Sequence, residues 1–93
     1  MAEQQSKVQS ISRQTLARGL IKYDTLSRGE ALDVLRWKCT GDALDAINAA
    51  PDPFADEIQG LPMLQSDSPF LKAITTHFGL KLAVIKMIFR KGA

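Results

Sequence analysis

Apolar residues recur at helical spacing along most of the chain and predict several helices. Ile11, Leu16, Leu20 and Tyr23 fall near a three-to-four-residue period, so we expect a helix over about 9–23. Similar periodicity in "ALDVLRW" and "ALDAINAA" predicts two more helices, over about 28–38 and 40–50. The pattern therefore predicts an all-α fold, a small bundle of four or five helices.

Capping signals place the ends of these elements. Ser27 is followed three residues later by Glu30, the spacing of a capping box at a helix N-terminus. Pro51 ends the third helix because proline supplies no amide donor and restricts the residue before it. The stretch "PDPFADEIQG" predicts a short fourth helix with Asp52 as its N-cap and Gly60 as its stop.

The last segment is the most apolar part of the chain. Ser68 and Pro69 provide a helix start, and apolar residues between Phe70 and Arg90 cover well over half of a helical wheel. This pattern predicts a long apolar C-terminal helix over 69–91, central or terminal in the bundle. A strand over 80–89 fits less well, because Lys81 and Lys86 would lie on opposite faces.

The length and composition indicate one domain in a reducing compartment. A chain of 93 residues has enough apolar material for a single core. We expect residues 1–8 to be a flexible N-terminal tail and residues 9–93 to form the single helical domain. The one cysteine, Cys39, excludes an internal disulfide, and the N-terminal residues lack a secretory signal. Lys81 and Lys86 interrupt the only candidate membrane span, so we expect a cytoplasmic protein without membrane association.

Charge is segregated along the chain. Residues 1–28 carry a net charge of +3, residues 29–68 carry −6, and the last 25 residues carry +5 with no acidic side chain. Either these segments partly neutralise each other or lie on solvated faces, or the two basic ends together form a surface for an anionic partner.

Residues for catalysis and for metal binding are missing from the sequence. His77 is the only histidine, so no conventional Ser-His-Asp or Cys-His arrangement can be built without it, and the helical spacing places it beside Ile74 and Lys81. One cysteine and one histidine give no zinc motif, and the acidic residues do not match a calcium loop. We therefore expect a protein that is not an enzyme and has no metal or other cofactor.

The function that remains is regulation by binding another macromolecule. We expect a small adaptor or inhibitor that docks on another protein or forms a homodimer. The candidate contacts are the apolar residues of the "LPMLQ" loop and of the last helix: Leu61, Met63, Leu64, Leu80, Val84 and Met87.

The alternative is nucleic-acid binding. The stretch "ITTHFGLKLAVIKMIFR" resembles a helix-turn-helix unit in outline. The resemblance rests on a glycine at the turn and on the apolar residues around it: Ile74, Phe78, Gly79, Leu80, Ile85 and Ile88. It implies that Lys81, Lys86 and Arg90 contact DNA. In this alternative the basic residues of the N-terminal segment assist them: Arg13, Arg18 and Lys22.

Overall fold

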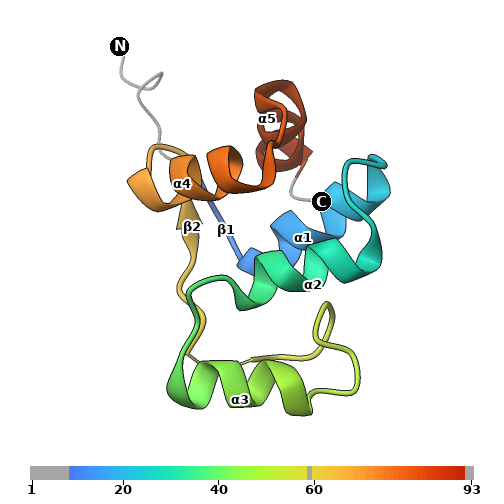
Figure 1. Cartoon of the computed structure of the whole chain (residues 1–93). Helices are drawn as coiled ribbons and strands as arrows, with labels where there is room; N and C mark the ends of the chain where they lie inside the picture. Colours follow the sequence, from blue (N-terminus) through green and yellow to red (C-terminus); the bar gives the residue numbers. More distant parts are fainter. Residues whose placement is uncertain (1–8, 59, 92–93) are drawn as a thin grey trace.

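The computed structural model describes residues 9–58 and 60–91, which form five helices and one short strand pair (Figure 1). In chain order the elements are β1 (Ser10–Ile11), α1 (Arg13–Lys22), α2 (Arg28–Arg36), α3 (Gly41–Ala49), β2 (Leu64–Gln65), α4 (Pro69–Phe78) and α5 (Leu82–Lys91). The prediction of a small all-α bundle is confirmed. The predicted tail, residues 1–8, lies outside the described residues. None of the five described helices has the length and apolarity to cross a membrane.

Serine residues begin three of the helices. Ser12 accepts a hydrogen bond from an amide in the first turn of α1. At α2 the predicted capping box is present: Ser27 Oγ accepts from the Glu30 amide at 3.2 Å, and Glu30 Oε1 accepts from the Ser27 amide at 2.9 Å. The predicted start of α4 is also confirmed, with Ser68 as N-cap and Pro69 as the first helical residue. These short side chains satisfy amides that a helix start leaves without partners.

The strand pair joins the beginning of the described chain to the segment before α4. Ile11 lies opposite Leu64 and Ser10 lies opposite Gln65 in an antiparallel register. The ladder continues through the Ser66 amide, which donates to the carbonyl of Gln9 at 2.8 Å. Two-residue strands have no measurable period, so the sequence pattern does not predict them.

The predicted long C-terminal helix is wrong, because the segment forms two helices of ten residues each. Gly79 adopts a left-handed conformation with φ of 64°, which ends α4. The Gly79 amide donates to the carbonyl of Thr76, and the Leu80 amide donates to that of Thr75, the hydrogen bonds of a Schellman motif. The next residue, Leu80, is buried, and the packing of its side chain in the core fixes the turn. The resulting corner turns α5 away from the axis of α4, so the two helices are not in line (Figure 1).

The predicted fourth helix is also wrong, because residues 51–56 form turns and bends only. Gln14 donates to the carbonyls of Pro53 and Asp56, each at 2.6 Å, and Arg18 donates to that of Phe54. The Pro53 and Phe54 carbonyls would have accepted the next backbone bonds of a helix. Side chains of α1 therefore hold this segment in an irregular form, with Phe54 buried.

The core consists of two clusters, and α1 contributes to both. One cluster joins α1 to α2, α4, α5 and the strand pair: Ile11, Leu16, Leu20, Val34, Leu64, Leu71, Ile74, Leu80, Ile85, Ile88 and Phe89. The other joins α1 to α2, α3 and the turn after α3: Ala17, Ala31, Leu35, Ile47 and Phe54. The central helix is therefore α1, which packs against both α2 and α5, and not the C-terminal segment.

Candidate functional site

The six predicted protein contacts do not form one exposed surface. Leu64 and Leu80 are only 2% and 7% exposed, so neither side chain is available to a partner. Leu64 belongs to the inward face of β2, and Leu80 closes the turn after α4. Met63 is 56% exposed, whereas Leu61 packs against the cluster around α3. The remaining two, Val84 and Met87, are half-buried on α5.

The six predicted nucleic-acid contacts are divided in the same way. Arg13 is buried in the interior of the fold. Arg18 and Lys22 are exposed on α1, where they line a hollow that also contains Asp52. Lys86 and Arg90 are exposed on α5, and the predicted Lys81 is exposed in the turn before it. The two basic ends therefore do not combine all of these residues into one patch.

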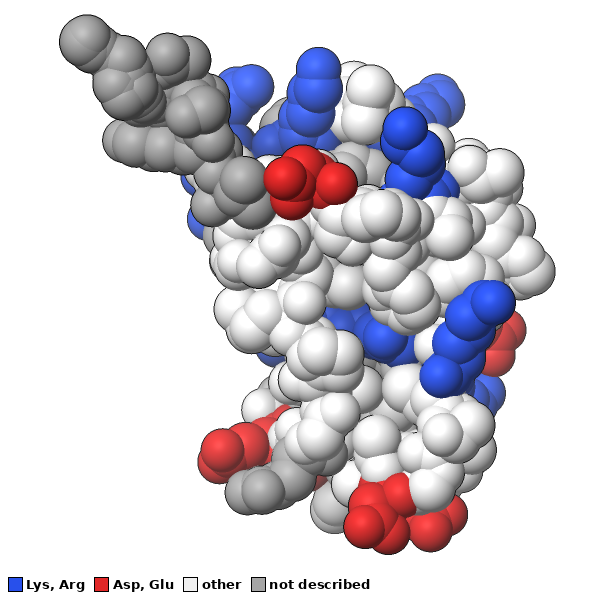
Figure 2. Space-filling view, turned by 90° about the vertical axis from the view of Figure 1, so that its left-hand side faces the viewer, with Lys and Arg blue, Asp and Glu red and all other residues white. Residues whose placement is uncertain are grey.

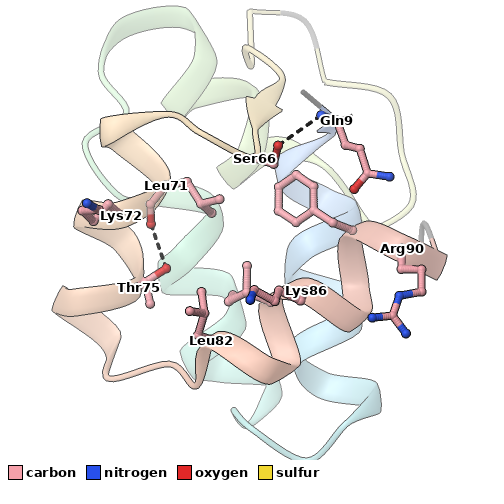
Figure 3. Close-up of a pocket in the computed structure, with 10 residues that line it drawn as sticks. Gln9, Ser66, Leu71, Lys72, Thr75, Leu82, Lys86 and Arg90 are labelled. Carbon is pink, nitrogen blue, oxygen red and sulfur yellow. Dashed lines mark hydrogen bonds between the residues drawn. The ribbon is translucent and has the colours of Figure 1, made fainter. Parts of the chain in front are cut away.

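A groove lies between α4 and α5 (Figure 3). Its volume is about 460 Å³. Leu71 and Thr75 face it from α4, and Leu82 and Lys86 face it from α5. Its complete lining is Gln9, Ser66, Leu71, Lys72, Thr75, Leu82, Ile85, Lys86, Phe89 and Arg90. We call this the α4–α5 groove.

The floor of the α4–α5 groove is apolar and its edges are basic. Leu71, Ile85 and Phe89 form the floor as part of the core, and Leu82 extends it outward with 61% of its surface exposed. The three cations of the lining are exposed: Lys72, Lys86 and Arg90. The spacing of four residues between Leu82, Lys86 and Arg90 puts these side chains on one stripe of α5, so the helix itself sets their alignment.

The polar groups in the lining are partly used within the protein. Thr75 Oγ1 donates to the carbonyl of Leu71 at 2.8 Å, and Ser66 Oγ accepts from the Gln9 amide at 3.1 Å (Figure 3). The first hydrogen bond fixes the wall formed by α4, and the second fixes the end formed by Gln9 and Ser66. The ammonium and guanidinium groups are therefore the main polar groups that the α4–α5 groove offers to a ligand.

Among the described residues, no carboxylate lines the groove. Within residues 9–58 and 60–91, the ion pairs are Arg28 with Asp52 and Arg36 with Asp33, both outside α4 and α5. Asp and Glu are absent from residues 69–93 altogether. Figure 2 shows acidic side chains at the lower end of the molecule and basic side chains over its middle and upper parts, with acidic side chains also at the upper centre and at the right-hand edge. The electrostatic potential of the groove therefore favours an anionic ligand.

Histidine and the aromatic residues around it form a structural cluster. The His77 ring lies 5.3 Å from the Trp37 ring and 4.8 Å from the Phe78 ring, measured between centroids. Trp37 also packs against Phe70 at 5.4 Å. No group of three metal-ligating side chains occurs among the described residues. The aromatic cluster links the end of α2 to both ends of α4.

The sequence pattern missed Lys72, Leu82 and Phe89 as site residues. On a continuous helix Lys72 falls in the polar sector, while Leu82 and Phe89 fall on the apolar side, so no shared surface is expected. The turn at Gly79 changes the relative direction of the two halves and brings these residues to one groove. The signal for this turn in the sequence was Gly79.

No protein-family model, curated protein or solved structure matches this chain.

Proposed function

We propose that this chain is a small non-enzymatic regulatory protein that binds another protein through the α4–α5 groove. The single observation that carries the proposal is the combination, in the described lining of one groove, of an apolar floor and three cations without a carboxylate. An amphipathic helix with acidic residues beside its apolar face is the partner that matches both properties. Its apolar residues would cover Leu82, and its carboxylates would face Lys72 and Lys86.

The spread of the cations favours a helical segment over one small anion. Lys72 projects from α4, whereas Lys86 and Arg90 lie one turn apart on α5. A single carboxylate cannot pair with all three, but carboxylates repeated along a helix can. The exposed Leu82 adds an apolar contact whose burial supplies about 2 kcal/mol. This arrangement resembles the apolar anchors and charged rim of a protein interface.

Selection from a displayed library of helix-forming peptides tests this proposal. We expect peptides enriched on the wild-type protein to carry apolar residues at positions i, i+3 or i+4 and i+7, with Asp or Glu on either side. The substitution Leu82→Asp is expected to weaken their binding about thirtyfold, because it removes an apolar anchor and adds a negative charge. The affinity of a selected peptide is measured by fluorescence anisotropy.

Met63→Asp is the matched control for Leu82→Asp. Met63 is the other large apolar side chain that is highly exposed in the described part of the chain, and it is not part of the groove lining. We expect this variant to bind the selected peptides like the wild type. Enriched peptides without acidic residues, or equal effects of the two substitutions, would contradict the proposed groove. A doubled solution mass that Leu82→Asp abolishes would show instead that the occupant is a second copy of this chain.

The second candidate is DNA binding, favoured by the corner between α4 and α5. Gly79 forms the turn, and Leu80, Ile85 and Ile88 are buried behind it, the distribution of a helix-turn-helix unit. Lys81, in the turn, and Lys86, on α5, are both exposed. Leu82 lies between them and offers no hydrogen bond to a base edge or phosphate, which is why we place this candidate second.

Salt dependence separates the two candidates. A labelled DNA duplex is titrated with the protein at low and at physiological salt. Phosphate contacts release counterions, so the affinity for DNA must fall steeply as salt rises. At low salt the Lys86→Ala variant must bind the duplex more weakly than the wild type, because it has lost a phosphate contact. A peptide held mainly by apolar contact loses much less affinity over the same range. Tight, salt-sensitive duplex binding without peptide enrichment would replace the first candidate with the second.

A further inference from the structure

A second hollow lies on the other side of α4, where α1 begins and α2 passes into α3. Its volume is about 310 Å³, and it shares no described lining residue with the α4–α5 groove. Arg13, Lys38, Cys39 and Thr40 contribute its polar lining, and Phe70 is part of its apolar wall. Of the residues that the structure describes, two cations and no carboxylate line this hollow.

Within the described chain, the guanidinium of Arg13 is buried without a carboxylate partner. The residue is 3% exposed, and Nη1 donates to the carbonyls of Leu35 and Trp37 at 3.0 and 2.8 Å and to Cys39 Sγ at 3.2 Å. Its Nε is buried and has no hydrogen-bond partner among the described residues. The guanidinium also lies 4.9 Å from the centre of the Phe70 ring. A buried cation in this state is costly unless a negative charge is added next to it.

Lys38 lines the same hollow through an unusual backbone, and its ammonium lies 5.1 Å from the centre of the Trp37 ring. Its φ is 56°, in the left-handed region that a lysine rarely occupies. The Cys39 amide then donates to the carbonyl of Arg36 at 2.9 Å, which closes the turn. Backbone strain of this kind is found preferentially at functional sites. It places Lys38, Cys39 and Thr40 in succession along the lining.

The N-terminus of α3 opens toward this hollow without a side-chain cap. Thr40 is the N-cap residue, but its hydroxyl makes no capping hydrogen bond, in contrast to Ser27 at α2. Thr40 and Ala43 both line the hollow. The free amides and the helix dipole of a first turn favour an anion. Asp42 lies in the same turn, but it is exposed and does not line the hollow.

We propose that this hollow binds a phosphate group, and that Arg13, Lys38, Thr40 and the N-terminus of α3 hold it. Arginine, lysine and helix N-termini are the groups that bind phosphate in proteins. The hollow continues over Phe70 and the apolar residues 61–62, so a phosphate monoester with an apolar body fits it better than inorganic phosphate. The site is independent of the peptide groove, because the two share no described lining residue.

Cys39 provides a reporter for occupancy, because it is the only cysteine of the chain and lines this hollow. The rate of its alkylation by neutral iodoacetamide is measured on the full-length protein, with sodium chloride holding ionic strength constant. We expect inorganic phosphate to slow the alkylation to a plateau, and phenyl phosphate to do so at a lower concentration. In urea-unfolded protein neither probe should change the rate.

Lys38→Gln tests the assignment, since Lys38 is exposed and its replacement leaves the core intact. We expect the half-protecting concentration of phenyl phosphate to rise about fivefold, the size of one solvent-exposed charge contact. Lys22→Gln, an equal charge change on α1 outside this hollow, should leave it unchanged. Arg13→Gln should abolish protection. If the Arg13→Gln variant does not fold, the Lys38→Gln variant still decides the test. Absence of protection, or equal protection in wild type and Lys38→Gln, would overturn the proposal.

Discussion

Gly19 is the residue on which the packing of α1 against α5 depends. A Cβ atom at this position would lie 2.6 Å from Cγ1 and 2.7 Å from Cδ1 of Ile88, closer than van der Waals contact permits. Ile88 is fully buried, so its side chain cannot turn into solvent to make room. The glycine therefore sets the distance between the two helices, and no sequence periodicity encodes that requirement.

Gly19→Ala is expected to lower the free energy of unfolding by about 1 kcal/mol. The overpacking costs about 1–3 kcal/mol, and the better helix propensity of alanine returns up to about 1 kcal/mol. Urea denaturation of both single variants and of the double variant with Ile88→Ala measures the coupling. In the Ile88→Ala background the new methyl group fills part of a cavity, so Gly19→Ala should stabilise the protein. The same loss in both backgrounds would show that the contact is not the cause.

Arg13 shows how far residue type alone can mislead about a site. The sequence groups it with Arg18 and Lys22 among the basic residues of the N-terminal segment, and the nucleic-acid alternative therefore counts it as a DNA contact. In the fold its guanidinium binds the end of α2, and burial lowers its pKa, while the adjacent Cys39 raises it. Arginine still remains protonated in proteins, so its charge is constant through the neutral range. Its burial depends on α2, which helical periodicity within α1 does not report.

At the scale of elements, glycine has opposite roles in α2 and after α4. Gly79 has φ of 64°, and an added Cβ would meet no atom within 4 Å, so only backbone strain opposes a side chain there. Gly29 lies in the first turn of α2, without positive φ and with equally open space around an added Cβ. The same substitution should therefore have opposite effects at the two positions.

Gly79→Ala is expected to destabilise the protein by about 1–2 kcal/mol, the cost of a left-handed conformation for an L-residue. Gly29→Ala is expected to stabilise it by a few tenths of a kcal/mol up to about 1 kcal/mol, because alanine restricts the unfolded chain. Thermal and urea denaturation of the two variants give the comparison. A stabilised Gly79→Ala protein would contradict the left-handed turn and favour a continuous helix.

Capping signals placed the starts of α2 and α4 correctly, whereas α1 begins at Arg13 and not near residue 9. Ser27 with Glu30 and Ser68 with Pro69 are local signals, and the structure confirms both. The prediction of one long helix over 69–91 missed the stop at Gly79, which only the helix-turn-helix alternative contained, because an isolated glycine costs only about 1 kcal/mol inside a helix and the apolar pattern continues past it. Burial of Leu80 by distant parts of the chain decides that the helix ends there. The turn at 51–56 was missed for a similar reason, since side chains of α1 compete for its carbonyls.

At the scale of the whole molecule, the two core clusters differ in how many residues their helices bury. Helix α1 buries five of its ten residues, whereas Ile47 is the only buried residue of α3. The lower part of the fold, formed by α3 and the turns after it, is therefore held by fewer apolar contacts (Figure 1). The groove between α4 and α5 belongs to the better-packed part, so the surface that we propose for a partner is preformed.

This difference predicts an order of amide hydrogen exchange. We expect α3 and residues 50–58 to exchange by local opening, and α1 to exchange only when the whole protein unfolds. Mass spectrometry of peptic fragments over a range of exchange times distinguishes the two regimes. Protection of α3 equal to that of α1 would show that both clusters open together.

The sites could be predicted less well than the fold. The charge of the two basic chain ends left an anionic partner as one of two interpretations, and the groove that we propose for it depends on the direction of α5 after Gly79. The phosphate hollow depends on Arg13, Lys38 and Phe70, which come from three separate segments. Local periodicity does not determine how such segments meet, so neither lining was available from the sequence.

The contact between Gly19 and Ile88 also has a consequence for synthesis of the protein. Translation at about 5–20 residues per second separates the appearance of these two positions by roughly 3 to 14 seconds. During that interval α1 lacks the helix that covers Leu16 and Leu20. The nascent chain therefore cannot complete its larger core until α5 has left the ribosome. Until then the apolar face of α1 is incompletely covered, at the stage of synthesis at which chaperones act.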